Sequence, residues 1–170
     1  MVHIKINKND KVPIRYVPKN LTTKDKAKQK KYLNKSRKDY KRGKYFIRPK
    51  VNSFKSRRSN HLKRLEILYK VPNAYPTKEL AKKSKCNIQT LKKIINKGEG
   101  AYLSSGSRPN QTPASWGYAR LASSLTGGNA ALVDMHLLEK GCKKNSKSLK
   151  LAKRLKDKKN KTKKIKALLK

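Results

Sequence analysis

The distribution of charge along the chain restricts its fold more than any other sequence feature. Residues 1–100 carry 31 basic and 6 acidic side chains, and residues 141–170 carry 14 and 1. Residues 101–140 carry only three basic and two acidic side chains. A nearly neutral segment therefore lies between two strongly cationic ones, which repel themselves when they are compacted. We expect the neutral segment to be the part of the chain that packs most readily.

The neutral segment has the pattern of two consecutive helices. Thr112 can cap the first, with Pro113 at the first helical position, where a missing N–H costs nothing. Apolar side chains then recur at helical spacing, at Ala114, Tyr118, Leu121 and Leu125. The glycines at 127–128 end this helix, and Asn129 caps a second helix that runs to Gly141. We interpret the pair as a helical hairpin of the core.

Small side chains line the first of these helices, at Ser115, Gly117, Ala119, Ala122 and Ser123. Such a surface lets another backbone approach closely. A glycine inside a helix lowers stability by about 1 kcal/mol relative to alanine, and close packing would offset that loss. We therefore select a candidate protein-packing motif in and before this helix. Its members are Arg108, Asn110, Trp116, Gly117 and Arg120.

The composition limits the classes of protein to which the chain can belong. A net charge of +39 with 35% hydrophobic residues allows one modest domain with extended arms in 170 residues. A chain with this charge needs polyanionic partners: nucleic acid, an anionic membrane surface or acidic protein faces. No run of 18 apolar residues predicts a transmembrane helix, and the N-terminus lacks the apolar core of a signal peptide.

The two cysteines, Cys86 and Cys142, lie 56 positions apart without a His or Cys close by in the sequence. This spacing does not fit a zinc site. We expect reduced thiols in an intracellular protein rather than a disulfide, although the sequence alone leaves the redox state open.

Residues 1–58 are expected to form a basic N-terminal arm with a marginal helix. Alternating apolar residues predict a short edge strand at 2–6, and a capping pattern at Thr22 predicts a helix that stops at Gly43. In residues 44–58, aromatic and apolar side chains alternate with Lys and Arg. They can stack bases and neutralise phosphates, or they can connect two elements with the aromatics buried. Both interpretations stay open.

Two further helical patterns precede the neutral segment. Ser59 caps the first, which ends before Val71 and Pro72. The second, at residues 77–98, reads TKELAKKSKCNIQTLKKIINKG and resembles a helix-turn-helix without the usual glycine in its turn. In that motif the second helix lies in the major groove of DNA, and here it would offer Asn87, Gln89, Thr90, Lys92, Lys93 and Asn96. A purely structural helical hairpin has the same spacing and is an equal alternative. Our candidate contacts to nucleic acid or another polyanion are Arg57, Arg58, Lys63, Arg64, Gln89, Lys92, Lys93 and Asn96.

Residues 97–113 are predicted to be a loop because they are rich in Gly, Ser and Pro. The glycines at 98, 100 and 106 indicate special backbone angles, and the loop lacks the pattern of a phosphate-binding P-loop. Residues 142–170 are predicted to be a Lys-rich tail. Ser146 can cap a short helix there, and such a tail is disordered when it is free.

No constellation of catalytic residues is present. The three histidines, His3, His61 and His136, are scattered, and we interpret His136 as a residue at the edge of the core. Serine-hydrolase and zinc-protease motifs and paired carboxylates are missing. We therefore expect a protein that is not an enzyme and that uses no cofactor, no metal and no small-molecule substrate.

A resemblance is carried by the sequence SGSRPNQTPASWGYARLASSLTGGNAALVD, from Ser105 to Asp134. It resembles an uncharacterised family of small basic proteins of large double-stranded DNA viruses, the nucleocytoplasmic giant viruses, with looser relatives in phages. The upstream stretch KELAKKSKCNIQTLKKIINKGEGAY is also similar. The resemblance supplies no activity. It implies a viral origin and a component of the virus particle.

These observations predict a mainly α fold with five or six helices. We expect a basic arm (1–58), a compact helical core (59–141) and a Lys-rich tail (142–170). The expected function is that of a minor capsid or internal virion protein whose arms bridge capsid subunits, other virion proteins or anionic surfaces such as viral DNA or membrane. The alternative is a DNA-binding protein, either genome-compacting or of the helix-turn-helix type. A ribosomal-type RNA protein fits the composition but not the resemblance.

Overall fold

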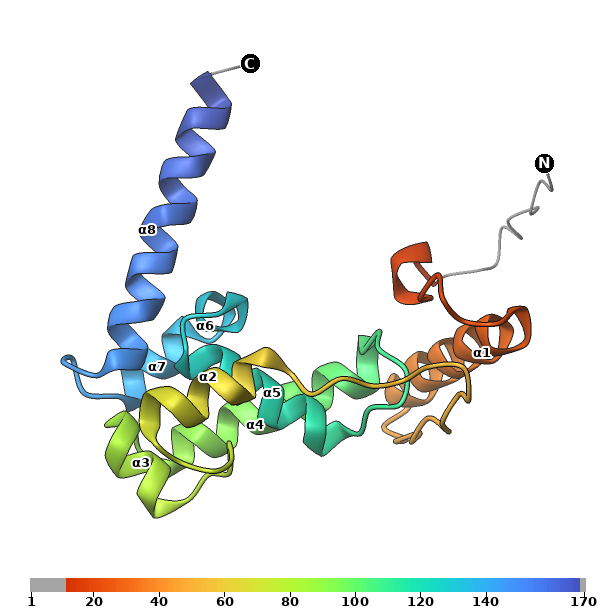
Figure 1. Cartoon of the computed structure of the whole chain (residues 1–170), viewed down its shortest axis with the longest axis horizontal. Helices are drawn as coiled ribbons and strands as arrows, with labels where there is room; N and C mark the ends of the chain where they lie inside the picture. The colour runs from red at the N-terminus through yellow and green to blue at the C-terminus, as the bar shows by residue number, and fades with distance from the viewer. Residues whose placement is uncertain (1–11, 169–170) are drawn as a thin grey trace. The chain divides into compact units, whose positions relative to one another are not determined.

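The computed structural model describes residues 12–168, with side chains up to Thr162, and this part of the chain is mainly helical (Figure 1). It contains a short 3-10 turn and eight α-helices, whereas the sequence predicts five or six helices. In chain order the elements are η1 (Ile14–Tyr16), α1 (Thr23–Tyr40), α2 (Asn60–Tyr69), α3 (Lys78–Ser84), α4 (Ile88–Ser105), α5 (Pro113–Leu125), α6 (Asn129–Val133), α7 (Met135–Gly141) and α8 (Lys147–Leu168). The expected mainly α fold is confirmed. The edge strand expected at residues 2–6 lies outside the described residues.

The chain divides into two compact units. The first unit comprises residues 1–57 and 100–113, and the second unit comprises residues 58–99 and 114–170. Helix α4 contributes to both. This division differs from the arm, core and tail expected from the sequence, because residues 100–113 join the N-terminal part and the C-terminal residues join the core of the second unit.

Several helices begin where hydroxyl side chains predict them to begin. Thr22 accepts a hydrogen bond from the backbone N–H of Asp25, and Ser59, Thr77 and Ser146 accept comparable bonds at the starts of α2, α3 and α8. Each bond satisfies an N–H group that has no partner within its helix. The starting points of these helices are therefore set by local sequence.

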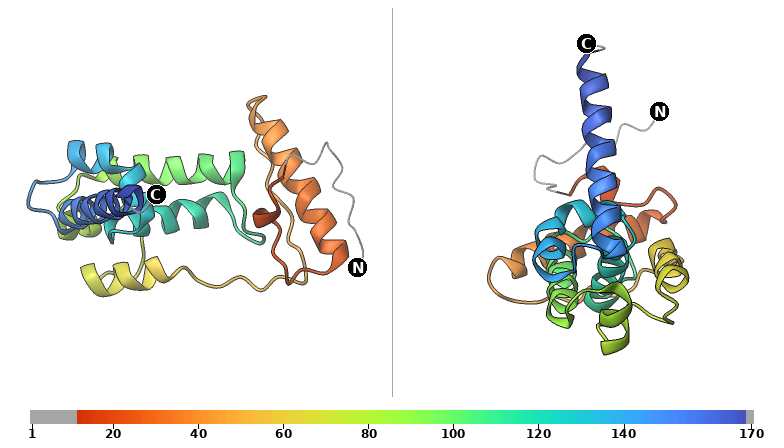
Figure 2. Two further views of the ribbon diagram at one scale, coloured as in Figure 1. Left: turned by 90° about the horizontal axis from the view of Figure 1, so that it is seen from above. Right: turned by 90° about the vertical axis from the view of Figure 1, so that its left-hand side faces the viewer.

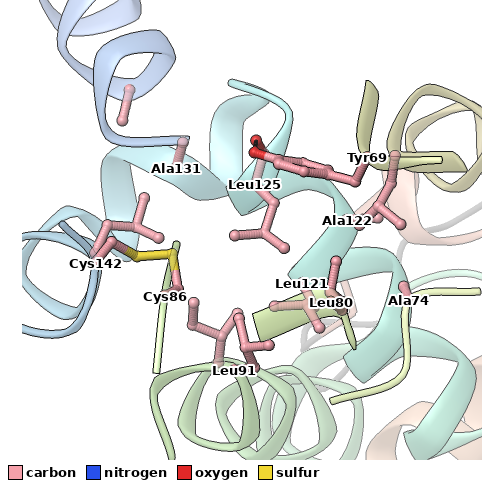
Figure 3. Close-up of a cluster of buried hydrophobic side chains, with 14 of the residues drawn as sticks. Tyr69, Ala74, Leu80, Cys86, Leu91, Leu121, Ala122, Leu125, Ala131 and Cys142 are labelled. Atoms are coloured by element: carbon pink, nitrogen blue, oxygen red, sulfur yellow. Dashed lines mark hydrogen bonds between the residues drawn. A yellow bond between two sulfur atoms is a disulfide. The ribbon is translucent and has the colours of Figure 1, made fainter. Parts of the chain in front are cut away.

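The second unit has a continuous apolar core to which α2–α8 all contribute. Leu65, Leu80, Leu91, Leu121 and Leu125 are fully buried in it, and Figure 3 shows the last four of these with Tyr69 and both cysteines around a common centre. The Tyr69 hydroxyl donates to the backbone carbonyl of Leu125 at 3.0 Å. Burial raises the pKa of Tyr69 to about 12. The expectation that the neutral segment packs in the core is confirmed by α5.

Helix α4 does not end at Gly98, as the sequence predicts, but continues to Ser105. A Cβ atom on Gly98 would lie 2.6 Å from the Cα of Gly117 in α5. Gly98 therefore permits close packing of two helices and does not break the first one. Of the described glycines, only Gly43 and Gly127 have positive φ, so the special backbone angles expected at 98, 100 and 106 are not found.

The helix expected to run from Asn129 to Gly141 is divided at Asp134 into α6 and α7, and Gly128 rather than Asn129 takes the N-cap position. The carboxylate of Asp134 is fully buried and accepts hydrogen bonds from Arg120 and Ser124 of α5. These tertiary bonds hold Asp134 at a non-helical backbone position, which local sequence does not encode.

The two cysteines form a disulfide, so the expected pair of reduced thiols is wrong. The turn between α3 and α4 lies antiparallel to the segment after α7, with Asn87 N–H donating to Gly141 O at 2.8 Å and Lys143 N–H donating to Lys85 O at 2.9 Å. The separation of 56 positions in sequence gave no sign of this contact, because tertiary packing alone brings the two segments together.

Helix α8 begins in the core and then leaves it. Leu149 and Ala152 are buried against the apolar cluster, whereas every described side chain from Lys156 to Thr162 is exposed. The views in Figure 2 show α8 standing clear of the other helices of the second unit. The helix expected after Ser146 is thus found, and it continues through the Lys-rich tail to Leu168. His136 on α7 is exposed and not at the edge of the core. Within residues 12–168, no helix is both long and apolar enough to cross a bilayer.

Candidate nucleic-acid interface

Helices α3 and α4 form a helix-turn-helix with a three-residue turn. Thr77 Oγ1 accepts from Leu80 N–H at 3.1 Å and starts α3, while Asn87 Oδ1 accepts from Thr90 N–H at 2.7 Å and starts α4. Lys85 follows α3 directly with φ 55° and ψ 35°. It adopts the left-handed conformation that glycine usually supplies in this turn. The missing glycine is therefore no obstacle to the motif.

The inward positions of the motif are apolar and buried. Leu80 of α3 and Leu91 and Ile94 of α4 are fully buried, and Ile95 and Cys86 are nearly so. All five belong to the apolar cluster of the second unit. The crossing of the two helices is therefore held by the core, which leaves the opposite side of α4 available for other contacts.

The outward side of α4 carries four exposed polar residues, Gln89, Lys92, Lys93 and Asn96. Their spacing of three, four and seven positions places them on one face of the helix. Carboxamides can form paired hydrogen bonds with adenine, and lysines can contact guanine or phosphate. All four are sequence-predicted contacts, and the structure brings them together.

Thr90 does not belong to this face. It is buried, and a Cβ atom on Gly141 would lie 1.7 Å from its Oγ1 atom. The prediction that Thr90 faces a partner is therefore wrong. Its side chain contacts Gly141, the last residue of α7.

Two further lysines near this face were not found by sequence reasoning. Lys85 and Lys143 are exposed, and the backbone bond between them places both beside the N-terminal end of α4. A helix N-terminus carries partial positive charge and unpaired N–H groups, so it attracts anions. Each lysine is adjacent in sequence to a cysteine of the disulfide, and only the tertiary pairing of these two segments brings the lysines together.

The other predicted polyanion contacts are distributed differently. Lys63 and Arg64 are exposed on α2, and Arg58 is paired with Glu66, whose Oε2 accepts from its Nη1 at 3.2 Å. His61, also on α2, has a lowered pKa because it is partly desolvated and lies near the charge of Arg64. Arg57 belongs to the first unit. The predicted cations therefore do not form a single patch on α4.

Arg120 from the predicted protein-packing motif is used inside the second unit. Its Nε and Nη2 atoms donate to the two oxygens of Asp134 at 2.9 and 2.7 Å, and Lys97 Nζ lies 3.3 Å from one of them. Burial raises the pKa of Asp134, but hydrogen bonds from Arg120 and Ser124 outweigh it, and the pKa is lowered overall. This cluster joins α4, α5 and the break between α6 and α7.

The remaining members of that motif divide between the two units. Gly117 is buried against Ile95 and Gly98, and Trp116 is half-buried on α5. Asn110 lies in the first unit with φ 56°, and its side chain bonds to the backbone of residues 51–54. Arg108, also in the first unit, is exposed. Two members of the motif therefore belong to the first unit and three to the second.

Among the described residues, no group of three or more His, Cys, Asp or Glu side chains is placed to hold a metal ion. Two groupings of described polar side chains in the second unit are the Asp134 cluster and the exposed face of α4. The arrangement is suited to binding a polyanion.

Comparison with known proteins places this chain in a family. Residues 13–137, from the segment before η1 into α7, match a family of unknown function, DUF5824. No curated protein and no solved structure matches the sequence significantly. Because the match covers most of the chain, this protein belongs to the DUF5824 family.

Proposed function

We propose that this protein binds duplex DNA, without catalysing a reaction, through the helix-turn-helix of α3 and α4. The observation that carries the proposal is the combination of a correct three-residue turn with a polar, exposed face on the second helix. In this motif the second helix enters the major groove and its outward side chains reach the bases. Gln89 and Asn96 would read base edges, while Lys92 and Lys93 would contact guanine or phosphate.

The charge around the motif supports the same partner. Lys85 and Lys143 flank the N-terminal end of α4, where a phosphate of the DNA backbone can accept from the N–H groups of the helix and from both ammonium groups. Helix α8 adds a row of exposed lysines from the same unit. Such cations bind nucleic acid by releasing its counterions, so the affinity would fall steeply as salt rises.

The test compares two variants that remove the same charge. Lys92→Gln with Lys93→Gln changes the proposed interface, and Lys24→Gln with Lys31→Gln changes two exposed lysines on α1 of the first unit. Fluorescence anisotropy with a labelled duplex over a salt series measures the DNA affinity of both variants. We expect the α4 variant to lose roughly two units from the slope of log affinity against log salt, and the α1 variant to change it less. Equal slopes in the two variants would contradict the proposal.

Sequence preference is the second readout. Selection from random duplexes would identify a preferred site, and Gln89→Ala or Asn96→Ala should then relax the preference by about 1–3 kcal/mol at individual base pairs. A selection that enriches no sequence while binding still depends on Lys92 and Lys93 would assign the chain to DNA compaction instead of site-specific recognition.

A second candidate function is that of a structural component of a large DNA virus particle, either a minor capsid or an internal virion protein. Helix α8 favours it, because its described side chains from Lys156 to Thr162 are all exposed and four of these seven are lysines. Isolated helices of this kind are marginal in water, so an acidic neighbouring subunit would stabilise it. Cross-linking mass spectrometry on intact particles tests this role. Links from the α8 lysines to capsid proteins would support a minor capsid role, and recovery of the protein only with the genome, linked mainly to DNA-associated proteins, would contradict it.

A further inference from the structure

The first unit contains a groove of about 740 Å³ that the helix-turn-helix does not use. The side chains that determine its character are Arg15, Phe54, Lys55, Arg57, Arg108 and Gln111. All lining residues belong to the first unit, although they come from three separate stretches of sequence. The volume lies within the range of small-molecule and nucleotide sites in proteins.

One buried and one half-buried amide hold the walls of the groove together. Gln29 of α1 is 2% exposed, and its Nε2 donates to the carbonyl of Ser107 at 2.9 Å and to that of Tyr16 at 3.3 Å. Asn110 Nδ2 donates to the carbonyls of Val51 and Phe54 at 2.9 and 2.7 Å. The three stretches near residues 16, 53 and 108 are therefore tied to each other by side chains and not by a sheet.

The groove is positively charged and its charge is not neutralised from within. Among the described residues, none of its four cations is paired with a carboxylate. The described acids of the first unit are Asp25 and Asp39. Asp25 accepts from the N–H and hydroxyl of Ser53 at 2.8 and 2.7 Å, and Asp39 pairs with Lys35 at 3.1 Å. Both carboxylates are therefore already occupied, and a ligand must supply the anionic partner.

The chemistry of the lining indicates which anion fits. Three of the four cations are arginines, whose planar guanidinium groups bind phosphate through paired hydrogen bonds. Phe54 is half-buried in the wall, and its backbone carbonyl is held by Asn110. An aromatic ring beside several arginines is the arrangement with which proteins bind unpaired bases on a phosphate backbone.

We propose that this groove binds a single strand of nucleic acid. Arg15, Arg57 and Arg108 would contact successive phosphates while one base stacks on Phe54. A duplex keeps its bases stacked on each other and cannot offer one to a half-buried ring. The site lies in a different unit from the helix-turn-helix, so the two proposals can fail separately.

The experiment measures binding of the full chain to a labelled single-stranded oligonucleotide and to a duplex. The groove variant carries Arg15→Gln, Arg57→Gln and Arg108→Gln. The matched control carries Lys41→Gln, Arg42→Gln and Lys44→Gln, three exposed cations of the same unit that do not line the groove. We expect the groove variant to reduce the single-strand salt slope by roughly 2, since each phosphate on a single strand contributes about 0.7, and to leave duplex binding close to that of the control.

A second comparison separates a nucleic-acid strand from other phosphate chains. Phe54→Leu keeps the wall apolar but removes the stacking ring, and it should weaken oligonucleotide binding by about tenfold while binding to an abasic strand of the same length is unchanged. Circular dichroism of each variant shows whether the fold is retained.

Equal single-strand binding by the groove variant and its matched control would overturn the proposal, because it would show that overall charge alone attracts the strand. Equal affinity of the native chain for the abasic strand and the oligonucleotide would also overturn it, since the groove would then bind phosphate without the base.

Discussion

The two units of this protein are stabilised by different means. The second unit has an apolar cluster of 18 buried residues and a disulfide. In the first unit, the buried apolar side chains number six among the described residues: Val12, Leu21, Leu33, Val51, Tyr102 and Leu103. Four buried polar residues accompany them: Asp25, Gln29, Ser36 and Arg48. The second unit thus depends on the hydrophobic effect, and the first unit depends more on hydrogen bonds from side chains to the backbone.

The buried polar groups of the first unit are nearly all directed at backbone atoms. Ser36 Oγ donates to the carbonyl of Leu103 at 2.6 Å, and Arg48 donates to the carbonyl of Gly106 while its guanidinium lies 4.0 Å from the centre of the Tyr102 ring. A buried carbonyl without a partner destabilises the fold by about 1–3 kcal/mol. These bonds therefore let irregular, cation-rich segments be buried where few apolar side chains are available.

The largest effect is expected in the second unit, at Asp134. Asp134→Ala leaves Arg120 partly buried without its carboxylate, so it should lower the free energy of unfolding by about 3–5 kcal/mol. Urea denaturation measures the loss, and hydrogen exchange on α1 should show the first unit unaffected. Asp157→Ala, on the exposed part of α8, is the control and should change stability by about 0.5 kcal/mol or less. A small effect at Asp134 would mean that the apolar cluster and the disulfide hold the second unit without this ion pair.

The disulfide offers the next comparison. It closes a loop of 56 residues, and loss of such a cross-link should lower the stability of the second unit by about 4 kcal/mol on the chain-entropy estimate. Chemical denaturation with and without a reducing agent measures the difference. The variant Cys86→Ser with Cys142→Ser should respond to denaturant as the reduced protein does and should be insensitive to the reductant. Identical unfolding curves for oxidised and reduced native protein would contradict this expectation.

In the first unit a single amide should have an effect of intermediate size. Asn110→Ala removes the partner of Val51 N–H and of two carbonyls, so it should destabilise the unit by about 1–3 kcal/mol. Asn110→Gly distinguishes the contribution of the side-chain hydrogen bonds from that of the backbone conformation, because glycine adopts positive φ freely but has no side-chain amide. Hydrogen exchange at Val51 N–H should be faster in both variants. Native protection in Asn110→Gly would show that only the backbone conformation matters.

The smallest effect is the pH dependence of stability that comes from one buried carboxylate in each unit, because it does not change stability near neutral pH. Backbone and hydroxyl hydrogen bonds from Ser53 lower the pKa of Asp25, and the pKa of Asp134 is also lowered because bonds from Arg120 and Ser124 outweigh its burial. A folded pKa below the unfolded value near 3.8 means that the ionised form stabilises the fold. That contribution is complete above pH 3.8 and is lost as the pH falls through the folded pKa.

Thermal unfolding from pH 7 to pH 2.5 measures this dependence. Stability should be nearly independent of these two groups above pH 5 and should fall below pH 4. Asp25→Asn should reduce the acid sensitivity of the first unit, and Asp134→Asn that of the second. An acid response that persists unchanged in each variant would assign it to other groups.

Local sequence was sufficient to predict the structure wherever a short-range pattern determines the backbone conformation. The hydroxyl caps at Thr22, Ser59 and Ser146 predicted where helices begin, since each cap bonds to an N–H within three positions. Most of the exposed face of α4 was also predicted, because apolar spacing identifies the buried side and therefore the opposite one, but Thr90 was assigned to it wrongly. Gln89, Lys92, Lys93 and Asn96 could be named without a structure.

Tertiary structure alone decided the features that depend on contacts distant in sequence. Gly98 resembles a helix end until Gly117 is placed against it, and Asp134 divides a predicted helix because its carboxylate bonds to Arg120. The pairing of Cys86 with Cys142 is a further example. Sequence determined the helical, cationic character of this protein, because both follow from residue type and spacing. Its two units, its disulfide and its groove follow from packing, whose partners lie dozens of positions apart.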